Sequence, residues 1–545
     1  MKMRNKKLVQ ALVLSSVLAA GAMPIAQAQT ADTSMPSLID VQQIELTGQL
    51  NLLTERTLGE LLAQLRQHKG KKMSQADLAQ LVQNSQKWLD AKLPGSFVLS
   101  IPAQTLSNGI LSMLVQPKLV DVTVAGAEGF DEANVRASLP SLTKGVALQS
   151  QGWVDVRELQ MANENPLKLT TVEYAVEPDK GVSAKVKATA PLGKTQGTVA
   201  LNNTGNDISG RGQFQVNAVN ANLTGEDDVL SFTGGGSLDP FAKSNYASLR
   251  YSVPDYAQHV SRTVELTHST GNLDFPFLSL GNIGTKGVYN DLSYRQAYYL
   301  GNVAQTLDAT KLTLGVSLIT NDSRTDFLGA TLSESEIKTV PLSVAFEGDF
   351  KITQPDQTRV RVEWLGSNVS WGGGDQSAQW SAARSGIDKR YNVMRMGVSG
   401  RVSLDSQAAF SWQYRGQYTS QKLLPVLQFS AINAYTGVRG FVNATGLGDT
   451  GQVLRLDLES GRMLDDADVR GYGFYDAGKK KGGSDERDIH VASAGLGARW
   501  TSSDRLMKLD VFAAKKMKGY EYDLVSNTST QKSRSSLWLL SSYSF

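Results

Sequence analysis

Side chains that could act as nucleophiles, acid–base groups or metal ligands are few and scattered in this sequence. Its 545 residues include no cysteine and four histidines, which are His68, His259, His268 and His490. No histidine pair has the spacing of a zinc motif, and no Walker loop or Gly-x-Ser-x-Gly elbow occurs. The run Trp371–Asp375 is typical of a flexible glycine-rich loop rather than of a phosphate cradle. The sequence therefore predicts no catalytic residue, no metal site and no cofactor, and we expect that the protein is not an enzyme.

Charged residues instead alternate with apolar ones in several segments, for example in 359–364, 453–459 and 507–511. Strict alternation places the two kinds of side chain on opposite faces of a strand. The charges that would share an inner face are Arg359, Arg361, Glu363, Arg455, Asp457 and Glu459. They fit the wetted wall of any pore, and they also fit a conduit of mixed charge that offers a polypeptide few apolar patches.

The net charge argues against a nucleic-acid partner. The formal charge is +3, but Lys2, Arg4, Lys6 and Lys7 stand in the first 28 residues, which contain no acid. Taking these four from the 55 basic residues leaves 51 against 52 acidic ones. A nucleic-acid binder needs a basic surplus to neutralise phosphates, so we exclude this class.

The first 28 residues have the parts of a secretory signal. A basic start precedes the apolar run Leu8–Ala22, and small residues at Ala26 and Ala28 fit cleavage before Gln29. An uncleaved anchor helix is the alternative, but the apolar run is shorter than the ~20 residues of a membrane span. We predict residues 1–28 to be a signal peptide that directs the chain out of the cytoplasm.

Two α/β units of the same element order are expected next. The first combines strands at 39–46, 97–101 and 110–115 with two helices, one carrying the stripe Leu58, Leu61, Leu62 and Leu65 and one starting at Ser74. The second combines strands at 119–124, 167–176 and 182–188 with helices at 132–139 and 153–163. A single mixed domain of about 150 residues is the alternative.

From about residue 195 onward the helical stripes stop and alternating segments continue to the C-terminus. The last strand places Leu537, Leu539, Tyr543 and Phe545 on one face, as in a lipid-facing strand that ends in an interfacial aromatic. Roughly 350 residues at about 20 per strand and loop correspond to about 16 strands. Because lipid tolerates no open edge, we predict a closed transmembrane antiparallel β-barrel.

Three short motifs in this region resemble a known family, the two-partner secretion transporters of Gram-negative outer membranes (the haemolysin secretion/activation family of the outer-membrane assembly superfamily). The loop motif of this family is matched by Val438, Arg439, Gly440 and Phe441. Gly448–Gly451 is similar to its Gly-Asp-x-Gly motif, and a wall motif is matched by Phe474, Asp476 and Gly478.

The resemblance implies the domain plan and the function. It implies POTRA domains at 29–118 and 119–192, which lie in the periplasm, and an outer-membrane barrel at 193–545 with an inward-folded loop at about 418–451. It implies that the POTRA domains recognise a partner exoprotein of the adhesin, cytolysin or contact-dependent toxin type, which is secreted unfolded through the pore. The barrel would contact outer-membrane lipid, and no cofactor is implied.

Two other functions remain as alternatives. An outer-membrane insertase of the same superfamily typically has three or more POTRA domains, whereas a diffusion porin has none. Members of the family commonly have an N-terminal helix that plugs the pore. About ten residues between Gln29 and the first strand are too few for a helix that spans ~30 Å, so we expect the plug to be missing.

Arg439 and Asp476 are expected to form a pair. If alternation continues, Phe474 and Asp476 face the lumen, where a guanidinium and a carboxylate can pair bidentately. We predict that this pair fixes the loop tip to the barrel wall, most strongly if Phe441 and Phe474 shield it from water. The alternative is that both side chains are separately solvated in a wet lumen.

Overall fold

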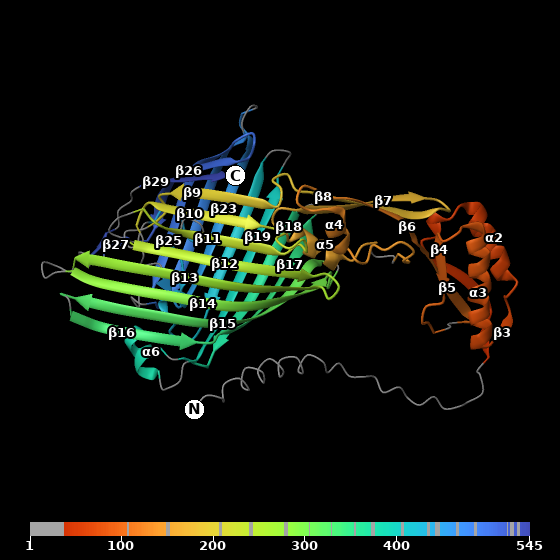
Figure 1. Ribbon diagram of the computed structural model, residues 1–545, viewed down its shortest axis with the longest axis horizontal. Helices are drawn as coiled ribbons and strands as arrows, with labels where there is room; N and C mark the ends of the chain where they lie inside the picture. The colour runs from red at the N-terminus through yellow and green to blue at the C-terminus, as the bar shows by residue number, and fades with distance from the viewer. Residues whose placement is uncertain are drawn as a thin grey trace. The chain divides into compact units, whose positions relative to one another are not determined.

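The computed structural model describes residues 38–545 apart from short internal gaps (Figure 1). The gaps are 106–107, 149–152, 206–209, 239–242, 277–281, 305, 329, 354–355, 372–375, 388, 405–407, 433–435, 442–446, 465–467, 484–487, 520, 524–527 and 531–534. The predicted signal peptide and the segment expected to lack a plug helix fall outside these residues, up to position 37. By its contacts the chain divides into two units, Met1–Gln116 and Pro117–Phe545. No helix of the described residues has the length and apolarity needed to cross a membrane.

The first unit is a small α/β domain. Its strands β2, β5 and β4 form one sheet in that order, with β2 and β5 parallel, and β1 pairs with β3. The single strand expected at 39–46 is divided at Gln42, so that each half pairs with a different strand. The elements are β1 (Ile39–Val41), β2 (Gln43–Gly48), η1 (Leu50–Leu52), α2 (Glu55–Arg66), β3 (Lys71–Met73), α3 (Gln75–Lys92), β4 (Phe97–Ser100) and β5 (Ile110–Pro117).

The two helices of this domain form where the sequence predicts them. Leu61 and Leu65 of the α2 stripe are fully buried. At the start of α3, the Ser74 hydroxyl accepts the Asp77 amide N–H at 3.2 Å, and the Asp77 carboxylate accepts the Ser74 N–H at 2.8 Å. This capping box satisfies two amide groups that the helix leaves free, and it fixes where α3 begins.

The second unit begins with another α/β domain, whose strands lie in the order β6, β8, β7. Its elements are β6 (Leu119–Ala125), α4 (Glu132–Ala137), α5 (Val156–Asn163), β7 (Leu169–Glu177) and β8 (Gly181–Thr189). Helix α5 starts at Val156, three residues later than predicted. The reason is an N-cap: the Asp155 carboxylate accepts the Arg157 amide N–H at 2.9 Å, which holds residue 155 outside the helix.

The rest of the second unit is a closed antiparallel barrel, in which β29 pairs with β9 (Figure 1). Strand β15 pairs with β16 over Ile319–Phe327 and with β17 over Leu307–Val316, so β16 and β17 share one position in the wall. Pro341 lies between them and cannot donate a ladder hydrogen bond. Counted this way, the described strands form a closed barrel of 16, which confirms the predicted antiparallel barrel of about 16 strands.

The barrel strands are long and most are joined by short connections. They are β9 (Thr195–Asn202), β10 (Gln213–Asn220), β11 (Val229–Ser237), β12 (Lys243–Asp255), β13 (Val260–Pro276), β14 (Asn282–Gly301), β15 (Leu307–Phe327), β16 (Ala330–Thr339), β17 (Leu342–Thr353), β18 (Asp356–Ser367), β19 (Tyr391–Ser403), β20 (Ala409–Tyr418), β23 (Thr450–Arg462), β24 (Asp468–Lys481), β25 (Ile489–Thr501), β26 (Met507–Lys518) and β29 (Ser535–Ser544). Outside the wall lie α6 (Ser377–Ala383), η3 (Pro425–Leu427), β21 (Phe429–Ser430), β22 (Leu447–Gly448), β27 (Glu521–Asp523) and β28 (Thr528–Thr530).

Exposure alternates along β29 as predicted. Leu537, Leu539 and Tyr543 are 69%, 45% and 47% exposed and form part of the outer surface, whereas Trp538 between them is buried inside. Phe545 follows them on the outer surface. An apolar outer face and a closed hydrogen-bond ladder are what a strand needs in lipid.

Candidate functional site

The connection between β20 and β23 folds against the inner face of the barrel. Val438, Arg439 and Phe441 in this connection are all buried. Val438 belongs to an apolar cluster with wall residues Val453 and Val491. These described residues lie within the inward-folded loop that was expected at about 418–451, between the ends of β20 and β23.

The structure brings Arg439 and Asp476 together. Arg439 donates Nε–H and Nη2–H to the two carboxylate oxygens of Asp476, each at 2.7 Å, and its backbone N–H to Oδ2 at 3.0 Å. Their side chains are 2% and 0% exposed. Two parallel hydrogen bonds between planar groups fix direction as well as distance, so the loop tip has one orientation on the wall.

An aromatic layer covers this pair. The Arg439 guanidinium carbon lies 3.8 Å from the centre of the Phe474 ring, and Phe474 meets Phe512 edge-on. Phe512 in turn stacks on Trp538. Excluding water strengthens the attraction between the two charges, and it makes either charge costly to leave alone.

A second carboxylate, that of Asp457 on β23, also accepts a hydrogen bond from Arg439 Nη2. Arg499 on β25 contacts Asp457 as well, and it binds Glu459 at 2.7 Å. Asp457 and Glu459 were expected only on the inner face of the barrel, as part of a wetted wall or of a mixed-charge conduit, and this contact was not predicted. The pairing register that places Asp457 opposite Phe474 brings Asp457 close to Arg439, but the residues of β23 alone do not determine this register.

The glycines of the two motifs allow a close approach between loop and wall. Gly440 has φ +87°, and a Cβ added there would lie 2.6 Å from the Ala514 Cβ on β26. A Cβ at Gly478 would lie 2.9 Å from Val438 Cγ2. Glycine avoids both clashes and accepts the left-handed backbone at 440 without strain.

Replacing Gly440 by alanine should therefore lift the loop from the wall. We expect faster proteolysis of the loop in the purified, folded protein and a clear loss of secretion, because strain and clash act together. Gly271→Ala is the matched control, since a Cβ at Gly271 meets nothing within 4 Å. Wild-type proteolysis and secretion by Gly440→Ala would contradict this role.

The Gly448–Gly451 motif anchors the same loop at the end that leads into β23. The Asp449 carboxylate accepts Arg384 Nη2 at 2.8 Å and the backbone N–H groups of Leu423 at 2.9 Å and Gly483 at 3.2 Å. Arg384 directly follows α6 and Gly483 follows β24, so this one carboxylate joins three separate connections between barrel strands. No motif in the sequence marks Arg384, so its role was not predicted.

Comparisons with known proteins decide the family. The family model described as haemolysin secretion/activation protein ShlB/FhaC/HecB matches residues 185–500, more than half of the chain. The chain belongs to this family. It is therefore an outer-membrane β-barrel transporter of two-partner secretion, as the loop and wall motifs indicated. The search of curated proteins finds no match.

Two solved CdiB structures share the fold of this family member. CdiB from Escherichia coli is 16% identical, with a TM-score of 0.65, over 99% of this chain and 97% of that one. CdiB from Acinetobacter baumannii is also 16% identical, with a TM-score of 0.59 over the same shares. BamA from Haemophilus ducreyi lacking POTRA domains 1–3 is 14% identical, with a TM-score of 0.46, over 93% of this chain and 100% of that one.

Among the described residues of this ShlB/FhaC/HecB family member, one group has the spacing of a metal site. It consists of Asp155, Glu158 and His259, which lie away from the loop and wall motifs. Arg157 donates to Asp155 and lowers the pKa of that carboxyl, whereas burial raises the pKa of Glu158.

Proposed function

We propose that this transporter recognises one unfolded exoprotein in the periplasm through POTRA domains at 29–118 and 119–192, and passes it outward through the barrel at 193–545. The Arg439–Asp476 pair supports the proposal most directly: it fixes a loop inside a pore whose mixed-charge wall suits a polypeptide. Residues 1–28 would direct export. Folding of the client outside the cell would supply the free energy for its export.

Recognition would use free strand edges, because an extended client can add itself to a sheet through backbone hydrogen bonds. In the first domain the outer edge of β4 is already occupied: the Gln86 side chain accepts the Leu99 N–H at 2.7 Å and donates to the Phe97 carbonyl at 3.1 Å. In the second domain β7 is an edge strand, with Leu169 and Val176 exposed. We therefore assign client binding to β7 rather than to β4.

Binding and secretion together test this function. We expect the full-length protein in detergent to bind an unfolded N-terminal fragment of its client with micromolar affinity. The affinity should change little between about 0.05 and 0.5 M salt, because backbone pairing rather than charge carries it. A scrambled fragment of the same composition is the control. Absence of binding to the genuine client, or unchanged secretion of that client in cells lacking the transporter, would refute the proposal.

A further inference from the structure

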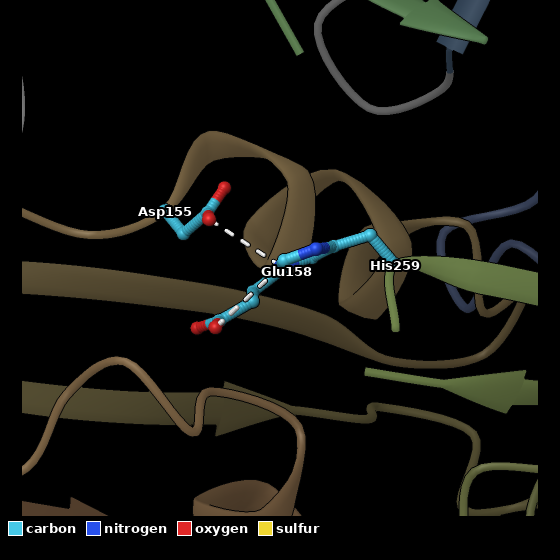
Figure 2. Close-up of side chains that lie close together, drawn as sticks. All are labelled: Asp155, Glu158 and His259. Atoms are coloured by element: carbon cyan, nitrogen blue, oxygen red, sulfur yellow. Dashed lines mark ion pairs between the residues drawn. The ribbon is translucent and has the colours of Figure 1, made fainter. Parts of the chain in front are cut away.

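Three possible metal ligands meet where the second α/β domain contacts a barrel turn. Asp155 precedes α5, Glu158 lies in its first turn, and His259 ends the connection from β12 to β13 (Figure 2). His259 Nε2 lies 3.3 Å from Asp155 Oδ2 and 3.9 Å from Glu158 Oε1. One donor atom from each residue lies within 4.8 Å of the other two.

One imidazole nitrogen of His259, Nε2, makes no hydrogen bond within the described residues. His259 has φ +53°, a left-handed conformation that is uncommon for a residue other than glycine. Its Nε2 is closed to solvent and has no hydrogen-bond partner among the described residues, although carboxylate oxygens lie so near. An imidazole nitrogen that makes no hydrogen bond and faces two carboxylate oxygens is an arrangement that a cation can complete.

The spacing fits a zinc-class ion. Zinc binds imidazole nitrogen and carboxylate oxygen at about 2.0–2.2 Å in tetrahedral geometry, which separates the ligand atoms by about 3.3–3.5 Å. The observed 3.3 and 3.9 Å need only a small closure of Glu158. A mixed set of one nitrogen and two oxygens suits zinc better than calcium, which takes six to eight oxygens.

Hydrogen bonds from neighbouring groups orient both carboxylates. Glu158 accepts the Ser141 hydroxyl at 2.6 Å and the Ser141 N–H at 3.1 Å. Arg157 donates Nε–H to Asp155 Oδ1 at 2.9 Å and Nη2–H to Oδ2 at 2.5 Å. Because the Arg157 side chain is 39% exposed, its guanidinium can turn into solvent and release Oδ2 when a metal binds. Hydrogen bonds of this kind to ligating carboxylates are usual around metal ions.

We propose that Asp155, Glu158 and His259 bind one zinc-class divalent cation, with water as the fourth ligand, and that the ion ties the second α/β domain to the β12–β13 turn. No metal site was expected, since the histidines are scattered and no cysteine is present, and His259 stands far from the two acids along the chain. The site lies outside the barrel lumen and does not depend on the proposed function.

The test is cobalt and zinc binding to the full-length protein in detergent after treatment with a chelator. We expect one Co²⁺ per chain with the visible absorption of a tetrahedral site, displaced by Zn²⁺, and a rise in melting temperature with zinc. His259→Ala and Asp155→Asn should abolish the absorption, and Ser141→Ala should weaken binding by about 10-fold. His268→Ala and His490→Ala are matched controls that should bind normally.

Two results would overturn the assignment. One is the absence of the tetrahedral cobalt spectrum in the folded wild-type protein. The other is an unchanged spectrum in His259→Ala or Asp155→Asn. Because two ligands are tested separately, the failure of one variant to fold still leaves a decisive measurement.

Discussion

Arg439→Ala should abolish most secretion while the barrel still assembles. The substitution removes the bidentate partner of Asp476, which is 0% exposed, and leaves only the more distant Arg455 Nε, 3.9 Å from Oδ1, to balance its charge. Breaking a buried ion pair by removing one partner costs about 3–5 kcal/mol. At about 1.4 kcal/mol per factor of ten, the ratio of attached to detached loop falls by about 100-fold or more. Secreted client in the medium is the measurement, and reduced gel mobility on heating checks that the barrel is folded.

The partner variant and the double variant decide whether the two residues act together. Asp476→Ala should have a similar defect, and the double variant should be little worse than either single one, because each single change already breaks the same contact. Arg439→Lys should rescue only in part, since an ammonium cannot donate two parallel hydrogen bonds. Normal secretion by both single variants, or defects that simply add, would show that the pair does not serve transport.

Asp457 provides a graded control within the same site. It accepts only one hydrogen bond from Arg439 and also contacts Arg499. Asp457→Asn should therefore reduce secretion less than Asp476→Ala does, because the bidentate contact remains.

The fold was predicted mainly from the alternation of apolar and polar residues along strands and from the residues that cap helices. The outer face of β29 and the start of α3 at Ser74 follow from patterns within a few residues, and the structure has both. The helix was expected to start at Trp153, but α5 starts at Val156. Asp155, three residues before Glu158, has the sequence signature of a helix N-cap, and this signature determines the start more strongly than the apolar Trp153 and Val154 do. The division of the first strand at Gln42 depends on pairing with β3, which no local pattern contains.

The site was predictable only where a motif marked it. Arg439 and Asp476 were identified by family resemblance and by the alternation of β24. Asp457 contacts the loop because of the register between β23 and β24, and Arg384 contacts it from the connection between β18 and β19. No local sequence pattern indicates either contact. His259 meets Asp155 and Glu158 only because a barrel turn packs on a separate domain.

A second large effect is expected at a buried ion pair that attaches the second α/β domain to the barrel. Lys168 lies just before β7 and pairs with Asp227 in the turn between β10 and β11, and the side chains are 0% and 1% exposed. Tyr256 donates its hydroxyl to Asp227 at 2.8 Å, and the Lys168 ammonium lies 5.3 Å from the Phe130 ring. Burial lowers the pKa of Lys168, and Asp227 acts against this shift.

Asp227→Ala should detach this domain from the turn, because it leaves the Lys168 ammonium buried without an anion, at a cost of about 3–5 kcal/mol. Lys168→Ala should act similarly by leaving Asp227 alone. In the full-length protein we expect rapid proteolysis within 117–192, a lower melting temperature for this domain and little secretion, with the barrel still heat-modifiable. Lys180→Ala is the matched control, since Lys180 is paired with Glu177 but its side chain is 76% exposed.

The combined variant Lys168→Met, Asp227→Asn tests whether the attachment of the second α/β domain to the barrel requires the two charges. It removes both ions but keeps their approximate volume, and replacing a buried pair by uncharged groups of similar size is often nearly neutral. We therefore expect the combined variant to resist proteolysis better than either single variant and to regain part of the secretion. If Asp227→Ala alone is as stable as the wild type, the pair does not hold the domain in place. If the combined variant is stable but does not secrete, the charges themselves serve transport.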